Sequence, residues 1–486
     1  MIDGLKPYPK MKDSGVPWLG EMPAHWDAAA IRRYSRVFAG ATPSRRIPKY
    51  WVGGSIPWLS SGDVNHRRIR AARQFITEAG YAASSATWIR PGSLVLALAG
   101  QGRTKGMVAT VEFPTTCNQS LAAIEPASHV ADYRFLAYYL ESRYLDIRAL
   151  VGDGLRDGLN LEHVRAMPTP LPPLAEQGAI VRFLDHADRR IQHYIHAKQK
   201  LIELLEEQKR AFIHRTVIRG LDPNVRLKPS GIYWLGDIPQ HWEAKRLKSL
   251  VTRVTSGSRG WSNFAADSGV LFIRIGNLTR TSIDLDLMDV VRLKLPSHVQ
   301  NEALRTRVQS GDVLLSITAY IGSVAVVPLD ISEAYVSQHV ACCRLRYGAA
   351  NPRWIAYVLL SAIGQVHGQL SMYGGTKQGL SLDDVKNYLI LLPPLDEQQV
   401  LVERIETELS DIHKGITNAR NDILLLREFH SRLIADAVAG NLDVREAAAR
   451  LPEPKEPEPL DKTNRHIEAD EDAREDLDDD VERVEW

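Results

Sequence analysis

The sequence predicts an α+β protein with an internal repeat: two α/β domains, each followed by a long helix, and the two helices paired antiparallel. Two pairs of matching segments predict the repeat, and a heptad pattern after each domain predicts the helices. Strand-like runs punctuated by glycine predict mixed α/β domains. With 486 residues, the chain is long enough for several domains that each bury a core.

Two matching segments frame each half of the chain. SGVPWLGEMPAHW at 14–26 and SGIYWLGDIPQHW at 230–242 are identical at eight of thirteen positions, with an offset of 216. GLNLEHVRAMPTPLPPLAEQ at 158–177 and GLSLDDVKNYLILLPPLDEQ at 379–398 are identical at ten of twenty positions, with an offset of 221. Because the order and the offset agree, the halves are predicted to be duplicates.

The middle of each half differs far more than its borders. Residues 38–155 and 255–375, here called the first and second inserts, share one short match, GSLVLA at 92–97 with GDVLLS at 311–316. A constant frame with divergent inserts is typical of two modules that recognise different things. Neutral drift of the inserts, with the frame kept by packing, remains the alternative.

A heptad seam follows each LPPL-x-EQ string. In the second half it has strict 4-3 spacing and is interrupted only by His430. In the first half it is rougher, because Asp188, Lys198 and Lys209 break it. The seam positions are Ile405, Leu409, Ile412, Ile416, Ala419, Ile423, Leu426, Leu433 and Ala437, and Leu184, Ile191, Ile195, Ile202, Leu205 and Phe212.

Each seam needs a partner, and an antiparallel pair would carry the two modules at opposite ends, related by a pseudo-two-fold axis. Gly220 and Gly440 are placed as helix C-terminal stops. The inserts read as mixed α/β: strands are expected at 93–100, 106–113, 269–276 and 312–327, and helices at 133–149 and 353–370.

These patterns predict a first domain at 1–173, a helix at 174–220, a second domain at 221–394, a helix at 395–445 and an acidic tail at 446–486 that is expected to be disordered. Residues 451–486 carry fifteen acidic and five basic side chains, so the net charge of +1 leaves +11 on residues 1–450. A basic body is what a phosphate-binding protein requires. The tail is read as a solvated end, or as a competitor for the DNA surface.

The sequence gives no sign of a membrane span, a secretory signal, a disulfide framework or a zinc site. Its three cysteines are Cys117, Cys342 and Cys343, and a reducing cytoplasm is the expected location. No P-loop, methyltransferase, hydrolase or metalloprotease motif occurs. Glu206, Glu207 and Lys209 could suggest a nuclease site, but a solvated helix face is the stronger interpretation.

The frame motifs resemble those of a known family. W-L-G-x-x-P-x-H-W, at 18–26 and 234–242, resembles the element that opens each half of the specificity subunits of type I restriction-modification systems, and L-P-P-L-x-E-Q, at 171–177 and 392–398, resembles the element that opens their conserved helices. PKYWVGGSIPW at 48–58, GDVLLS at 311–316 and VSQHVA at 336–341 are similar to segments of their target recognition domains. The first insert departs from this pattern, with Gly92-Ser93 and Cys117-Asn118-Gln119 where Gly-Asp and Val-Ser-Gln are usual.

This resemblance implies a sequence-specific DNA-binding subunit without catalytic activity or a cofactor of its own. Each target recognition domain would read one half of a split target in double-stranded DNA, and the paired helices would set the gap. Two methyltransferase subunits using S-adenosylmethionine, and two ATP- and Mg2+-dependent restriction subunits, would complete the complex. The outward faces of the helices, at 177–217 and 398–437, would receive the methyltransferase subunits, or would only keep the pair soluble.

Polar loops beside the predicted strands are the candidates for DNA contact, because Arg pairs with guanine and Asn or Gln with adenine. In the first insert the base-reading candidates are Ser60, Ser61, Asp63, Asn65, Arg67, Arg68, Gln101, Arg103 and Lys105. In the second they are Arg259, Arg274, Asn277, Thr279, Arg280, Tyr320, Gln338 and His339. Candidates for phosphate contact are Arg45, Arg46, Arg156 and Lys377. The frame tryptophans Trp18, Trp26, Trp234 and Trp242 are expected in the core rather than on bases.

Two other functions remain open. A fused or orphan DNA-modifying enzyme would need a catalytic motif and would cut or methylate DNA alone. A coiled-coil scaffold without a DNA role would show no salt-dependent DNA affinity.

Overall fold

The contacts in the computed structural model divide the chain into two compact units, and each unit takes one part of both long helices. One unit comprises Met1–Ile195 and Leu424–Trp486, and the other comprises His196–Ile423. The structure describes residues 5–100, 103–151, 158–372 and 379–452. No helix in this described part is both long and apolar enough to cross a membrane.

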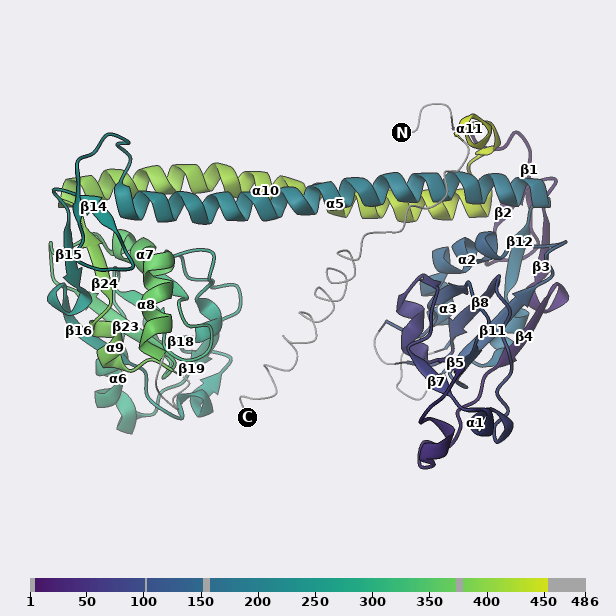
Figure 1. The fold of residues 1–486 in the computed structure, drawn as a ribbon, viewed down its shortest axis with the longest axis horizontal. Coiled ribbons are helices and arrows are strands. Elements are labelled where there is room, and N and C mark those ends of the chain that lie inside the picture. Colours follow the sequence, from purple (N-terminus) through teal and green to yellow (C-terminus); the bar gives the residue numbers. More distant parts are fainter. Residues whose placement is uncertain (1–4, 101–102, 152–157, 373–378, 453–486) are drawn as a thin grey trace. The chain divides into compact units, whose positions relative to one another are not determined.

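The first unit contains a five-stranded sheet of order β4-β11-β8-β9-β6 and a three-stranded sheet of order β10-β5-β7 (Figure 1). Two small sheets, β1-β2 and β12-β3, belong to the frame. The strands are β1 Met11–Asp13, β2 Glu21–Pro23, β3 Asp27–Ala30, β4 Ser35–Ala39, β5 Ile56–Leu59, β6 Arg68–Ile69, β7 Gln74–Ile76, β8 Ser93–Ala97, β9 Val108–Val111, β10 Thr116–Cys117, β11 Leu121–Pro126 and β12 Pro168–Leu171.

The second unit repeats this plan. Its sheets have the orders β16-β23-β20-β21 and β17-β19-β18-β22, and its frame pairs are β13-β14 and β15-β24. The strands are β13 Leu227–Pro229, β14 Asp237–Pro239, β15 Glu243–Arg246, β16 Val251–Ser256, β17 Ala265–Ala266, β18 Val270–Ile273, β19 Val291–Leu293, β20 Val313–Ser316, β21 Val324–Val326, β22 Ala334–Val336, β23 Val340–Leu345 and β24 Leu389–Leu392.

The strand orders confirm the predicted duplication, although β6 and β17 have no counterpart strand in the other unit. β4-β11-β8-β9 corresponds to β16-β23-β20-β21, and in both orders the third strand pairs antiparallel with its two neighbours. β10-β5 corresponds to β22-β18, and both pairs are parallel. The inserts therefore share a fold although their sequences have diverged.

The predicted elements of the inserts are mostly present, with three breaks. The run 312–327 is a hairpin of β20 and β21 rather than one strand, since Tyr320 and Gly322 take positive φ angles of 52° and 96° between them. The helix expected at 133–149 divides into α2 and α3, and that at 353–370 into α7 and α8. The helices are α1 Glu78–Ala82, α2 Tyr133–Ser142, α3 Tyr144–Ala149, α4 Leu161–Ala166, α5 Leu174–Arg219, α6 Gln300–Thr306, α7 Pro352–Leu360, α8 Ala362–Met372, α9 Leu382–Lys386, α10 Leu395–Ala439 and α11 Arg445–Arg450.

The repeated H-W and E-Q motifs bind each other. In the first unit Glu176 accepts hydrogen bonds from Trp26 Nε1 at 3.0 Å and from the Tyr8 hydroxyl at 2.5 Å, and lies 2.8 Å from His25 Nε2. In the second unit Glu397 accepts from Trp242 Nε1 at 3.1 Å and lies 2.8 Å from His241 Nε2. Both indoles are fully buried, so Trp26 and Trp242 belong to the core as predicted, whereas Trp18 and Trp234 are half-buried at its edge.

The glutamine of each E-Q string anchors the helix that follows it. Gln177 accepts a hydrogen bond from the amide of Asp132, the N-cap of α2, and donates to the carbonyl of Pro172. Gln398 accepts from the amide of Asn351, the N-cap of α7, and donates to the carbonyl of Pro393. Each glutamine is buried, so it satisfies backbone groups that water cannot reach.

The heptad seam of α10 is buried as the spacing predicts, whereas in the rougher seam of α5 Leu184, Ile191 and Ile195 are buried and Ile202, Leu205 and Phe212 are half-buried. Except for Leu426, which is half-buried, every predicted apolar seam residue of α10 is buried. In both units α5 and α10 run antiparallel (Figure 1). The polar breaks in the α5 seam each have a partner on α10: Asp188 is 3.1 Å from His430, Lys198 is 2.8 Å from Asp422, and Lys209 donates to His413 at 2.9 Å.

A glycine ends each long helix against a frame tryptophan. Gly220 and Gly440 have φ angles of 70° and 81°, which glycine adopts without strain. A Cβ on Gly440 would lie 2.3 Å from Pro23 Cδ and 3.0 Å from the Trp26 ring, whereas one on Gly220 would lie 3.3 Å from the Trp242 ring. Both predicted helix stops are therefore present, and the one at Gly440 is more tightly packed.

The chain after α10 returns to the first unit. Asp443 forms a bridge with Lys6, and α11 buries Ala448 in the same core as Trp26. Residues 446–450, expected as part of a disordered tail, are therefore helical. The rest of that tail from residue 453 onward lies outside the described residues.

Candidate DNA interface

The candidate DNA-binding residues lie mainly in loops and short 3-10 turns that leave the insert strands. Ser60, Ser61, Asp63 and Asn65 follow β5, and Arg274 and Asn277 follow β18. Tyr320 lies between β20 and β21, and Gln338 and His339 lie between β22 and β23. Three candidates, Gln101, Arg156 and Lys377, lie outside the described residues.

In the second insert, three loops bring four candidates together. The Arg280 guanidinium lies 5.3 Å from the centre of the Tyr320 ring. In the neighbouring loop Gln338 Nε2 lies 2.9 Å from His339 Nε2, and the other ring nitrogen of His339 lies 3.0 Å from the hydroxyl of Thr318. The Thr318 contact joins the β20–β21 and β22–β23 loops, so these polar side chains are held as a group.

Tyr320 is the one non-glycine residue of the described chain with a positive φ, 52°. Its side chain is about half exposed. The left-handed backbone costs about 1 kcal/mol for a residue with a Cβ, and such strain is concentrated at ligand-binding sites. The conformation presents an aromatic ring beside an arginine on the surface of the insert.

In the first insert, Arg45 is supported by aromatic rings. Its guanidinium lies 4.6 Å from the Trp51 ring and 5.5 Å from the Trp58 ring, and it donates to the Gln74 side chain at 3.2 Å. Arg45 is exposed, as is Arg46. The rings orient a cation at the surface, which suits contact with a phosphate or a base edge.

Two predicted base-reading residues stabilise their own loops. The carboxylate of Asp63 is buried and accepts hydrogen bonds from the amide and hydroxyl of Ser60 at 2.7 and 2.9 Å. Asn277 is also buried; it accepts from the amide of Arg274 and donates to the carbonyls of Asp286 and Asp289. These contacts favour a structural role for both side chains over a base contact.

Two further candidates, Arg67 and Arg68, point to acidic residues of the helices. Arg67 lies 2.7 Å from Glu141 on α2 and 3.2 Å from Asp188 on α5, and Arg68 lies 2.7 Å from Asp185 on α5. Burial opposes the charge of Arg67, but the negative charge of Glu141 and the contacts with Tyr138 and Asp188 raise its pKa. These arginines attach the insert to the frame.

The remaining candidates divide by exposure. Lys105 is buried. Arg274 and Thr279 have partners within their own loops: Arg274 lies 3.7 Å from Asp289, and the Thr279 hydroxyl accepts a hydrogen bond from the amide of Ser282. Ser60 and Ser61 are half-buried. The exposed candidates, besides Arg45, Arg46, Arg68, Arg280 and Tyr320, are Asn65, Arg103 and Arg259.

Two residues of the first insert, Thr42 and Gln119, were not among the predicted candidates for DNA contact. The hydroxyl of Thr42 donates to the side chain of Gln119 across the loops that follow β4 and β10. Gln119 corresponds to Gln338 at the offset of 219 that relates GSLVLA to GDVLLS. This alignment was the available signal, and it places a glutamine at the same position of both inserts.

The buried thiols are structural rather than reactive. Cys117, Cys342 and Cys343 are free and buried, and burial raises the pKa of Cys117 and Cys343 to about 12. Within the described part of the chain, no three His, Cys, Asp or Glu side chains are grouped to hold a metal ion.

Comparison with known proteins agrees with this geometry. The family model described as the type I restriction modification DNA specificity domain matches twice, at residues 34–205 and 239–419. The EcoBI specificity subunit of Escherichia coli is 23% identical over 74% of this chain and 77% of its own length. The EcoKI specificity subunit of Escherichia coli K12 is 22% identical over 87% of this chain and 93% of its own length.

Solved structures show the same fold. A chain from a study of complex assembly and conformational transition of the type I R-M system aligns with a TM-score of 0.66 at 17% identity, over 86% of this chain and 99% of its own. The HsdS subunit from Thermoanaerobacter tengcongensis aligns with a TM-score of 0.50 at 17% identity, over 86% of this chain and 98% of its own. With the family model matching both halves, the chain belongs to the DNA specificity subunits of type I restriction-modification systems.

Proposed function

We propose that the chain reads a split DNA target, with one half-site for each insert. The observation that carries this proposal is a duplicated strand order and frame under inserts whose surface loops differ. Equivalent frames would present both inserts to one duplex, and different loops allow the half-sites to differ in sequence. Two modules joined by a spacer read half-sites at a spacing that the spacer fixes.

Base reading is assigned to the grouped loops. In the second insert, Arg280 and Gln338 would offer donors to guanine and adenine edges in the major groove, with Tyr320 packed against the arginine. In the first insert, Arg45 and Gln119 would take these roles and Arg46 would contact phosphate. Arg45→Ala should weaken DNA binding, whereas Ser60→Ala should act mainly on the stability of its turn.

The chemistry is assigned to partner subunits. We propose that two methyltransferase subunits bring S-adenosylmethionine to the DNA, that two restriction subunits use ATP and Mg2+, and that this chain contributes recognition alone. The helices offer surfaces for such partners, because they expose large apolar side chains. These are Tyr194, Leu201 and Leu204 on α5 and Leu424, Leu425 and Phe429 on α10.

Docking and recognition should therefore separate by mutation. Phe429→Glu should leave the DNA affinity of the purified chain unchanged while it abolishes methylation in a cell that supplies the partners. Arg280→Ala should reduce both. If Phe429→Glu leaves methylation intact, this face of α10 does not receive the methyltransferase.

Base-resolved methylation mapping of a host with and without this gene tests the function as a whole. The expected result is adenine methylation that depends on the gene and falls in a motif of two short specific parts separated by a fixed unread gap. An unchanged map, or a contiguous motif, would contradict the proposal. Methylation by the purified chain alone would favour a modifying enzyme instead.

A further inference from the structure

Sheet register places an arginine and an aspartate at the same position of the two inserts. In the first unit Leu94 of β8 pairs with Thr110 of β9, and Thr110 pairs in parallel with Arg68. In the second unit Val313 of β20 pairs with Val326 of β21, and Val326 forms a parallel bridge with Asp284. Leu94 and Val313 correspond in the GSLVLA and GDVLLS match, so Arg68 and Asp284 are equivalent.

The residues near this position are similar in both halves. They lie on α5 and α10, and on α2 and α7, two helices that fall within the insert ranges but are counted here with the frame because Gln177 and Gln398 bind their N-caps. Helices α2 and α7 align at an offset of 219, so Arg134 is equivalent to Arg353. Helices α5 and α10 align at an offset of 221, so Asp185 is equivalent to Glu406. Each frame therefore presents an arginine and an acid to its insert. The charge supplied by the insert is reversed, and the first half carries two further acids, Glu141 and Asp188, where the second half has Leu360 and Leu409.

In the first unit the insert contributes cations. Arg68 lies 2.7 Å from Asp185, whose other oxygen is 3.6 Å from Arg134. Arg67, next to Arg68, adds its contacts with Glu141 and Asp188. Two adjacent arginines of the insert thus bind acids on two frame helices.

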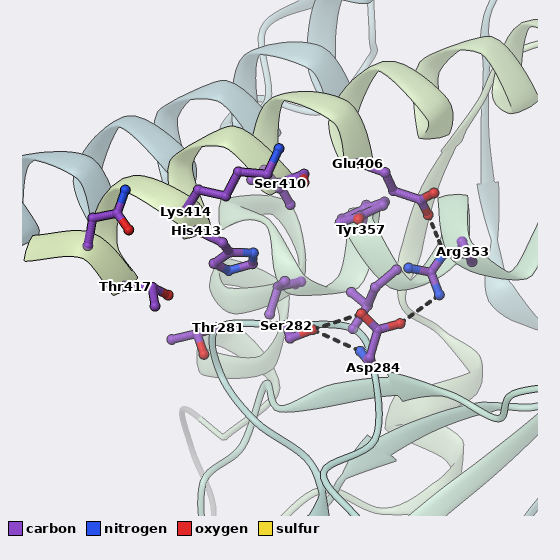
Figure 2. A pocket seen from close by; sticks show the side chains of 14 residues that line it. Thr281, Ser282, Asp284, Arg353, Tyr357, Glu406, Ser410, His413, Lys414 and Thr417 are labelled. Atoms are coloured by element: carbon purple, nitrogen blue, oxygen red, sulfur yellow. Dashed lines mark hydrogen bonds and ion pairs between the residues drawn. The ribbon is translucent and has the colours of Figure 1, made fainter. Parts of the chain in front are cut away.

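In the second unit the insert contributes an anion. Asp284 lies 2.7 Å from Arg353, and the same guanidinium donates to Glu406 of α10 (Figure 2). The Arg353 side chain is about one-third exposed and that of Asp284 is 62% exposed, so the guanidinium is partly shielded from water while the carboxylate is open to it. In the second unit, therefore, the frame residue that binds the insert is an arginine, whereas in the first unit it is an acid.

The seam between insert and helices differs accordingly. Beside Asp284 and Arg353, a groove of about 700 Å3 extends along α10 past His413 and Thr417 (Figure 2). In the first unit the corresponding cavity beside Arg67 and Arg68 measures about 20 Å3. The seam is therefore nearly closed beside Arg67 and Arg68 and open beside Asp284 and Arg353.

We infer that ion pairs of opposite polarity, here called the charge code, fix each insert on its own half of the frame. In the first half the insert supplies the cation, and in the second half it supplies the anion. Arg68, which the sequence suggested as a base reader, and Asp284 act here as positioning residues, and each sets the angle at which its insert meets the DNA. The inference rests on the proposed function. An arginine at position 284 would face Arg353, and an aspartate at position 68 would face Asp185, so either reversal replaces attraction with repulsion.

Charge reversal with rescue tests this code in the full chain. The probes are a duplex with both half-sites from the methylation map, and two duplexes in which one half-site is scrambled. Asp284→Arg should lower the discrimination for one half-site about tenfold and leave the other unchanged, because a tilted insert forfeits the equivalent of one base contact. Arg68→Asp should do the same for the opposite half-site.

Rescue separates positioning from general damage. The double variant Asp284→Arg with Arg353→Glu restores opposite charges, because the new guanidinium would face two carboxylates, the one introduced on α7 and that of Glu406. This double variant should recover the discrimination to within about twofold. The matched control is Lys245→Glu, which reverses an exposed charge on β15 that pairs with Glu243 of the same strand. This control should leave the discrimination for both half-sites unchanged.

Three outcomes would overturn the inference: unchanged discrimination in Asp284→Arg, an equal loss for both half-sites, or failure of the double variant to recover while its unfolding midpoint matches that of the unaltered chain. If the double variant does not fold, Arg68→Asp still decides, because its loss must fall on the opposite half-site. Failure of the unaltered chain to prefer the split duplex would instead refute the proposed function.

Discussion

Replacing Glu176 with alanine should destabilise the first unit more than the equivalent change at Glu397 destabilises the second. Glu176 is 6% exposed and accepts from two buried donors, the Trp26 indole and the Tyr8 hydroxyl. A hydrogen bond to a charged acceptor contributes about 1.5–3 kcal/mol, and a buried donor left unpaired is costly. Glu176→Ala should therefore cost about 3–5 kcal/mol of unfolding free energy.

Glu397 has one buried donor, and its side chain is 30% exposed. Water can replace part of what is lost there, so Glu397→Ala should cost about 1–2 kcal/mol. His25 and His241 are both nearly half exposed and add little to the difference.

Hydrogen exchange followed by mass spectrometry on the full chain measures the two units separately, because each opens with its own free energy. Glu176→Gln is the matched control: it keeps an acceptor oxygen and should cost less than alanine. An equal or larger loss in Glu397→Ala, or a loss below about 1 kcal/mol in Glu176→Ala, would refute the reasoning.

Three further predictions concern the long helices. Gly440→Ala should lower the free energy of unfolding by about 2–3 kcal/mol and Gly220→Ala by about 1 kcal/mol, since only the Cβ at 440 collides with rigid frame atoms. Urea unfolding of the two variants compares these losses, and equal losses would contradict the packing described above. Lys209→Met should raise the unfolding free energy by about 1 kcal/mol, because burial lowers the pKa of a lysine that is 3% exposed; a loss would show that its bond to His413 matters more. Burial alone would raise the pKa of Asp188, but His430 and Arg67 lower it below its ordinary value, so its contribution to stability is present above about pH 4 and is lost progressively as the pH falls further. Acid titration of Asp188→Asn should therefore show a shallower loss of stability than the unaltered chain, and an identical slope would be the contrary result.

The frame could be predicted from the sequence because its determinants are local and occur twice. The H-W and E-Q strings indicated a repeat, although their mutual contact through Glu176 and Glu397 joins segments about 150 residues apart in the chain and has no local signature. The heptad spacing predicted the helix pair in the same way. The sequence did not explain why polar residues break the α5 seam. The structure explains them by their partners on α10, such as His413 for Lys209.

The candidate DNA site was less accessible to sequence reasoning. The S-x-x-D spacing of Ser60 and Asp63 is a capping signal at the start of a turn, and it explains why Asp63 is buried instead of exposed. Arg67 was placed among the base readers because arginine in a polar loop suits DNA. Its acidic partners, Glu141 and Asp188, come from distant helices, which the tertiary fold alone brings to it.

The gap between the half-sites tests the central claim most directly. Affinity of the full chain should be measured for two duplexes that keep both half-sites. One has the unread gap found in the methylation map, and the other has a gap about five base pairs longer, which is half a helical turn. Because α5 and α10 are continuous helices that contribute to both units, the lengthened duplex should bind no better than one with a single half-site. Equal affinity for both gaps would contradict the account.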